Sequence, residues 1–158
     1  MTLEDFAIRL SETPLAIGLT DSEWAFPALE SVHVIALTLV IGSIAIVDLR
    51  LLGIAARERD ASQLIKAILP VTWVAFAFAV ATGVLMFVAN PISYVANTAF
   101  LVKLGLLLVA GVNMALFHMF AHKHLATERA LAPRLSGAAS LTLWVAIVTA
   151  GRWIGFTL

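Results

Sequence analysis

The chain lacks cysteine altogether and carries few charged residues. The absence of cysteine excludes disulfide bonds, thiolate metal sites and cysteine nucleophiles. Only 13% of the 158 residues are Asp, Glu, Lys or Arg, whereas 61% are hydrophobic. A soluble domain of this length exposes too much surface to water for so apolar a composition. The chain is therefore expected to be an integral membrane protein.

The sequence also lacks an excess of positive charge, since its formal net charge is zero. Nucleic-acid-binding proteins carry a basic patch, so no nucleic-acid partner is expected. A Ser-His-Asp set, a glycine-rich phosphate loop and paired catalytic carboxylates are missing, which argues against hydrolase and kinase chemistry. The acidic start, MTLEDFAIRL, has no basic n-region, so a cleaved signal peptide is not expected.

Four apolar stretches are each long enough to cross about 30 Å of hydrocarbon as a helix. They cover residues 28–49, 67–89, 98–120 and 137–156. Short polar connectors between them favour antiparallel neighbours. The sequence thus predicts an all-α fold, an up-and-down bundle of four transmembrane helices that occupies residues 27–158.

Residues 1–26 form a separate N-terminal segment. Its residues Leu3, Phe6, Ala7 and Leu10 follow the i, i+3, i+4, i+7 spacing of an amphipathic helix, which Pro14 interrupts. Such a helix is expected to lie on the membrane interface. An aromatic belt is expected at the same level. Its residues are Trp24, Phe26, Tyr94 and Trp153.

Loop charge predicts the orientation of the bundle. The second connector, NPISYVAN, has no Lys or Arg, whereas the first and third connectors are basic. Their basic residues are Arg50, Arg57, Arg59, Lys66, Lys123, Arg129 and Arg134. Basic connectors stay in the cytoplasm. We therefore expect both termini to lie outside, in the periplasm of a bacterial inner membrane.

Small residues predict where helices pack closely, within the protomer or between protomers. Ala75, Ala79 and Gly83 recur at every fourth position of the second span. Ala146 and Ala150 do so on the fourth span, and Gly105 and Gly111 lie on the third.

Polar side chains gather at one level near the outer ends of the spans. At 1.5 Å per helical residue, His33 lies about 9 Å below the outer edge and Lys103 about 8 Å below it. Met86 and Arg152 both lie at about 6 Å, so four helices each place such a residue at one depth. Glu30 is one turn above His33 and is expected to pair with Lys103 or Arg152.

A second polar level lies near the cytoplasmic ends. His118 and Asp48 are about 30 Å from the outer edge, and Asn113 is somewhat deeper in the membrane. Asn113 is expected to hydrogen-bond to a neighbouring helix. His118 and His122, in the string HMFAHKH, share a helix face and have spacing suited to a transition metal.

The depth difference excludes one attractive haem site. His33 and His118 come from parallel spans but differ in depth by about 20 Å, far more than an iron–histidine bond of about 2 Å. Within one protomer they cannot ligate the same metal. A haem at the outer level therefore needs another second ligand, and Met86 is the best placed.

Three strings carry a resemblance: VHVIALTLVIGSIAIVDLRLLG, NTAFLVKLGLLLVAGVNMALFH and LWVAIVTAGRWI. They resemble an uncharacterised family of small bacterial four-helix inner-membrane proteins. More distantly, the chain is similar to copper-resistance-D-like membrane domains and to small four-helix b-type cytochromes. The cytochromes ligate haem through histidines on their transmembrane helices, but this chain lacks the four such histidines that two bis-histidine haems need.

The resemblance to the cytochromes implies a cofactor, haem b, and roles for several residues. It implies that His33 is an axial ligand and that Lys103 and Arg152 contact the haem propionates. It also implies a second ligand site at His118, together with His122.

The leading hypothesis is a b-type haem protein that transfers electrons within or across the membrane, possibly as a membrane oxidoreductase. Its expected electron partners are a quinone or a periplasmic redox protein. One alternative is a homo-oligomeric transporter of metal ions or small solutes, with copper or zinc bound by His33, His118 and His122. Another is a structural or assembly protein of the membrane. A homo-oligomer is expected because four short spans bury few polar groups.

Overall fold

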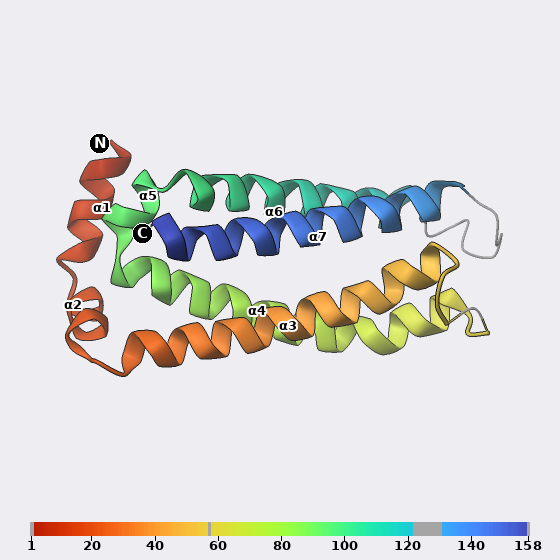
Figure 1. Ribbon diagram of the computed structural model, residues 1–158, viewed down its shortest axis with the longest axis horizontal. Helices are drawn as coiled ribbons and strands as arrows, with labels where there is room; N and C mark the ends of the chain where they lie inside the picture. The colour runs from red at the N-terminus through yellow and green to blue at the C-terminus, as the bar shows by residue number, and fades with distance from the viewer. Residues whose placement is uncertain (1, 57, 122–130, 158) are drawn as a thin grey trace.

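The computed structural model describes residues 2–56, 58–121 and 131–157, and in these residues every regular element is a helix. The elements are α1 (Leu3–Ser11), α2 (Pro14–Asp21), α3 (Ala25–Leu51), α4 (Ala61–Ala89), α5 (Pro91–Ala96), α6 (Thr98–Leu116), the π-helical turn η1 (Phe117–Ala121) and α7 (Leu131–Thr157). Four helices, namely α3, α4, α6 with η1, and α7, are long and apolar enough to span a membrane. The predicted four-helix membrane bundle is confirmed (Figure 1).

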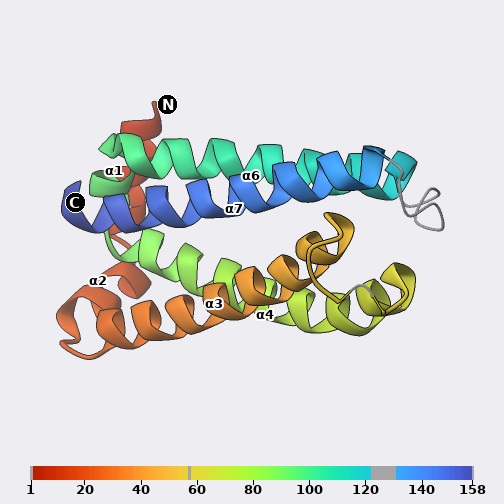
Figure 2. The same cartoon turned by 45° about the vertical axis from the view of Figure 1, so that its right-hand side comes forward.

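The two ends of the bundle differ in what covers them. The chain termini lie at one end together with α1, α2 and α5, and we call this the terminal end (Figure 1). The connector between α3 and α4 lies at the opposite end, which we call the connector end (Figures 1 and 2).

The N-terminal segment forms two short helices rather than one. The side chain of Thr2 accepts from the backbone N–H of Asp5 and the Asp5 carboxylate accepts from that of Thr2, a capping box that starts α1. These hydrogen bonds hold the pKa of Asp5 below its ordinary value. Thr13 caps α2 in turn, and the Thr20 hydroxyl donates to the carbonyl of Ala89 at 3.1 Å. The pair α1–α2 is thereby fixed across the terminal end.

The spanning helices begin and end where local chemistry allows. Gly53 adopts φ +73° directly after α3, a left-handed conformation that a glycine adopts without strain. The Asp60 carboxylate accepts from the N–H of Gln63 and starts α4, several residues before the predicted span. The predicted second connector is itself helical, because Pro91 suits a first turn and starts α5. Asn97 then caps α6.

The four spans are arranged as two helix pairs. Helix α3 packs on α4, α6 packs on α7, and α3 packs on α7 (Figures 1 and 2). Nowhere do α4 and α6 approach within 8 Å, Cα to Cα. The order across the bundle is therefore α4–α3–α7–α6, although α4 and α6 are consecutive spans in the sequence.

One apolar cluster joins all four spans halfway along the bundle. Its buried members are Val40 from α3, Ala75 from α4, and Trp144 and Ile147 from α7. Leu106, Leu107 and Ala110 of α6 pack against it. The cluster forms the core between the two ends of the protein, and we call it the central cluster.

The small residues behave differently on different helices. The prediction of close packing is confirmed for Ala75 and Ala79, which are both only 5% exposed. At Gly105 and Gly111, by contrast, a Cβ would have no described atom within 4 Å, so neither glycine makes a close contact within the protomer.

The aromatic-belt prediction is wrong for one residue. Trp24 and Trp153 are well exposed, as an interfacial position requires. Tyr94 is instead 6% exposed and packs with Phe87 and Phe100, at centroid distances of 6.2 and 5.2 Å. The three rings tie α4, α5 and α6 together at the terminal end.

The closest approach between the helix pairs is at Gly137 of α7. A Cβ at Gly137 would lie 3.1 Å from the Cβ of Leu51 and 3.2 Å from the carbonyl oxygen of Asp48. The backbone atom of Asp48 cannot yield as a flexible side chain would. The α3–α7 contact at the connector end therefore depends on the absence of a side chain at this position.

Replacing Gly137 tests this packing. We expect Gly137→Ala to destabilise the bundle by about 1–3 kcal/mol, the usual cost of an overpacked contact. Gly105→Ala is the matched control, because it adds the same methyl group where nothing is near and gains up to about 1 kcal/mol of helix propensity. Circular dichroism during SDS-induced unfolding compares the midpoints, and equal shifts in the two variants would contradict the close approach.

Candidate functional site

Each of the four spans contributes to a polar site near the terminal end, on that side of the central cluster. His33 comes from α3, Thr82 and Gly83 from α4, Lys103 from α6 and Gly151 from α7. We call this group the terminal-end site. His33 lies eight residues into α3, about 12 Å from the start of the helix.

The imidazole of His33 is held by Thr82. The Thr82 hydroxyl donates to the backbone carbonyl of Phe78 at 2.7 Å, so its oxygen must act as an acceptor toward the imidazole. The Nδ1–H of His33 therefore donates to Thr82 Oγ1 over 2.9 Å. This arrangement makes Nε2 the nitrogen with the lone pair, which is the form of histidine that binds a metal.

A small residue on α4 makes room for the imidazole. A Cβ at Gly83 would lie 3.2 Å from Cε1 and 3.6 Å from Nδ1 of His33. The ring thus packs directly on the backbone of α4. Met86 is three residues further along the same helix, so it lies on the same face one turn nearer the terminal end.

Lys103 places a positive charge in the site. Its Nζ and Cε would lie 3.4 and 3.6 Å from a Cβ at Gly151, so the side chain runs closely over the backbone of α7. The charge of Lys103 also acts electrostatically on His33. A histidine and a lysine thus face one another across the two helix pairs.

Arg152 and Glu30 belong to the surface rather than to this interior group. Arg152 is exposed, and its guanidinium lies 4.7 Å from the ring centroid of Phe156, a cation–π contact on its own helix. Glu30 is also exposed, and its charge acts on Tyr94 of α5. Burial, followed by the negative charge of Glu30, raises the pKa of Tyr94 above its ordinary value.

The connector end holds a second polar group. Asn113 of α6 donates to the carbonyl of Ser136 on α7 at 3.1 Å and accepts from the Ser136 hydroxyl at 3.2 Å, which confirms the predicted hydrogen bond to a neighbouring helix. The Nδ1–H of His118 donates to the carbonyl of Met114 at 2.9 Å. Asp48 is buried beside Ser140.

His122 lies outside the described residues, as do the connector residues Arg57, Lys123 and Arg129. Within the described residues, no three His, Asp or Glu side chains come together as a metal site. The predicted pair of His118 and His122 therefore stays a prediction.

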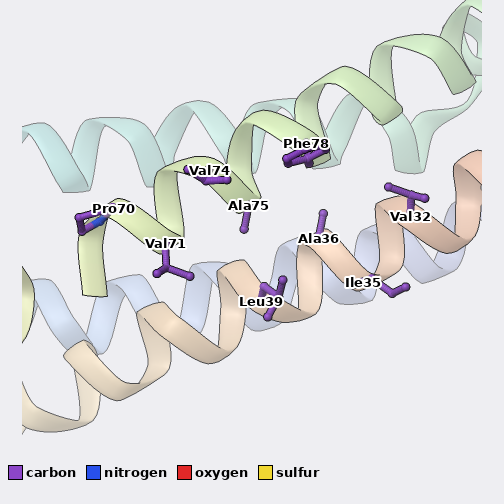
Figure 3. A pocket seen from close by; sticks show the side chains of 9 residues that line it. All are labelled: Val32, Ile35, Ala36, Leu39, Pro70, Val71, Val74, Ala75 and Phe78. Carbon is purple, nitrogen blue, oxygen red and sulfur yellow. The ribbon is translucent and has the colours of Figure 1, made fainter. Parts of the chain in front are cut away.

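Two grooves lie on the bundle, and neither is lined by His33 or Lys103. One, of about 470 Å³, lies between α3 and α4, and its labelled side chains, such as Leu39, Val71 and Phe78, are all apolar (Figure 3). The other, of about 720 Å³, lies between α6 and α7 and includes Ala146 and Ala150. Apolar surface of this kind suits lipid chains.

Comparison with protein families places this geometry in a wider group. A family model described as a family of unknown function (DUF6644) matches residues 17–157, which include all four spans and the terminal-end site. The chain belongs to this family. No curated protein and no solved structure matches the chain.

Sequence reasoning missed the residues that hold His33 and Lys103 in place. Thr82 resembles any threonine in an apolar helix, and Gly151 carries no signal of its own. Gly83 was recognised as a packing residue but not as a neighbour of His33. The available signal is register, since Ala75, Ala79 and Gly83 mark the face of α4 that packs on α3.

The sole tyrosine of the chain makes the terminal end testable. We expect Glu30→Gln to lower the pKa of Tyr94, because the variant removes the negative charge that opposes tyrosinate formation. The pKa should still exceed the ordinary value, since burial remains. Tyrosinate absorbance during alkaline titration reports Tyr94 alone, and Glu23→Gln, which changes an exposed acid outside the spans, is the control. An unchanged pKa in Glu30→Gln would show that α3 and α5 are not arranged as described.

Proposed function

We propose that the chain is a b-type haem protein of the inner membrane that transfers electrons, with the haem bound at the terminal-end site. The observation that carries the proposal is the geometry of His33. Thr82 fixes the Nδ1–H tautomer, which leaves Nε2 as a ligand nitrogen in the membrane interior. The distant similarity to small four-helix b-type cytochromes points the same way.

The residues around His33 fit an anionic porphyrin. Lys103 offers a positive charge for a propionate, and glycines at positions 83 and 151 leave the backbone accessible on two helices. Because α4 and α6 do not pack on each other, the site lies where the bundle is not closed by helix contacts. Met86 lies one turn from Gly83 on the same face and is the candidate second ligand.

A bound haem would supply the one-electron chemistry. The protein's own contribution is to hold the imidazole in one tautomer and one orientation through Thr82. The positive charge of Lys103 offsets the negative charge of a propionate in surroundings of low polarity. The aromatic cluster of Phe87, Tyr94 and Phe100 covers the terminal end and limits the access of water.

The proposal includes an orientation and partners. The described cations Arg50, Arg59, Lys66 and Arg134 all lie toward the connector end, which supports placing that end in the cytoplasm and the termini in the periplasm. A haem near the terminal end would then exchange electrons with a quinone in the membrane or with a periplasmic redox protein.

A polar transport path through one protomer receives less support. On α3, the polar interior contacts are His33 with Thr82, near the terminal end, and Ser43 with Thr72, where the Thr72 hydroxyl donates at 2.8 Å. Ten residues, about 15 Å, separate His33 from Ser43. The central cluster, with Val40 fully buried, lies between them.

The test is the optical spectrum of the protein purified from haem-sufficient cells. We expect a Soret band that is lost in His33→Ala and a haem affinity that falls about 10–100-fold in Thr82→Val, because the second hydrogen bond orients the ligand. Met86→Ala should change the spectrum without loss of haem, as expected when one of two axial ligands is removed.

His118→Ala is the matched control, because it removes a histidine from the opposite end of the bundle. This variant should keep the Soret band. A colourless wild-type protein from haem-sufficient cells would overturn the proposal, and so would a full Soret band in His33→Ala. A band that disappears in His118→Ala but persists in His33→Ala would place the cofactor at the connector end instead.

A further inference from the structure

The connector end contains a buried acid that the proposed haem site does not use. Asp48 is one turn before the end of α3 and is only 5% exposed. Its Oδ2 has no hydrogen-bond partner, and Ser140 of α7 is the side chain that interacts with the carboxyl group. A buried carboxylate that lacks a partner is strongly unfavourable, so a cation must accompany it or a proton must neutralise it.

The described basic side chains at this end are engaged elsewhere or exposed. Arg50 donates from Nε to the carbonyl of Arg59 at 2.8 Å, and Arg134 donates from Nη2 to the carbonyl of Leu52 at 3.3 Å. On α4, which packs against α3, Lys66 is exposed.

The nearest imidazole is also directed elsewhere, because the Nδ1–H of His118 donates to a backbone carbonyl of α6. Protein cations of α3, α4, α7 and η1, among the described residues, therefore do not neutralise Asp48.

A metal ion fits this position poorly. Sodium, calcium and magnesium ions need several oxygen ligands around them. Asp48 and Ser140 supply few, and the described residues contain no group of three acidic or histidine side chains. Space is also short, because Gly137 brings α7 so close to Asp48 that a Cβ there would lie 3.2 Å from the Asp48 carbonyl oxygen. The cation that fits is a proton.

We propose that Asp48 is an exchangeable proton-binding site at the α3–α7 contact. With the proton bound, a neutral carboxyl group beside Ser140 allows α3 and α7 to pack at Gly137. After loss of the proton, the negative charge would require water or a cation at this contact. The Arg134 guanidinium is the nearest supply, since its partner Leu52 is one turn from Asp48 on α3. Proton binding would thus control how the two helix pairs meet at the connector end.

Infrared spectroscopy of the full-length protein in lipid nanodiscs tests the site. The C=O stretch of a protonated carboxyl group is separate from the bands of carboxylates. At neutral pH we expect such a band in the wild type and its loss in Asp48→Asn, whose neutral amide has nearly the same shape. Glu30→Gln is the control, because it removes an exposed acid from the same helix and should leave the band unchanged.

The pH dependence of unfolding gives a second measurement with a defined sign. If the folded protein holds a proton that the unfolded chain releases, stability falls as the pH rises. The SDS unfolding midpoint should therefore fall toward alkaline pH in the wild type and stay nearly constant in Asp48→Asn. A wild-type spectrum without a protonated-carboxyl band that depends on Asp48 would overturn the proposal. A band removed by sodium chloride at constant pH would also overturn it, in favour of a metal cation.

Discussion

The contact between α3 and α7 is the constraint on which the rest of the structure depends. Helices α3 and α4 form one pair and α6 and α7 the other, and among the four described spans only α3 and α7 join the pairs. The central cluster, with Val40 opposite Trp144 and Ile147, forms the middle of this contact. Gly137 forms its connector end. Since lipid tails are as apolar as the helices, close packing rather than hydrophobicity must hold the pairs together.

The sequence was sufficient to predict the spans and the depths of polar residues. Helical rise is nearly constant, so counting residues placed His33 toward one end and Asp48 toward the other, as observed. Counting does not reveal which helices are neighbours. The consecutive spans α4 and α6 do not pack on each other, and the helical α5 connects them across the terminal end. Tyr94 is buried for the same reason, because α5 turns it toward Phe87 and Phe100.

Depth alone also failed to distinguish Lys103 from Arg152, although the two residues lie at similar levels. The inward face of α7 is marked by Trp144, Ile147 and Ile154, which are all buried. Gly151 follows this spacing at seven residues from Trp144, whereas Arg152 is one position further and is exposed. Lys103 therefore runs over Gly151 into the interior, and Arg152 stacks on Phe156 outside. The sequence lacked the direction of each face, which only the packing partners supply.

The separation of the two polar levels determines how they can influence one another. Fifteen residues of α3 lie between His33 and Asp48, a distance of about 22 Å. At an effective dielectric constant of about 20, two unit charges at that distance interact by only about 0.8 kcal/mol. Direct electrostatic coupling between a haem at one level and a proton at the other would thus be weak. Any stronger coupling must act through the position of α3, which contacts His33's partner α4 on one side and packs against α7 at Gly137 on the other.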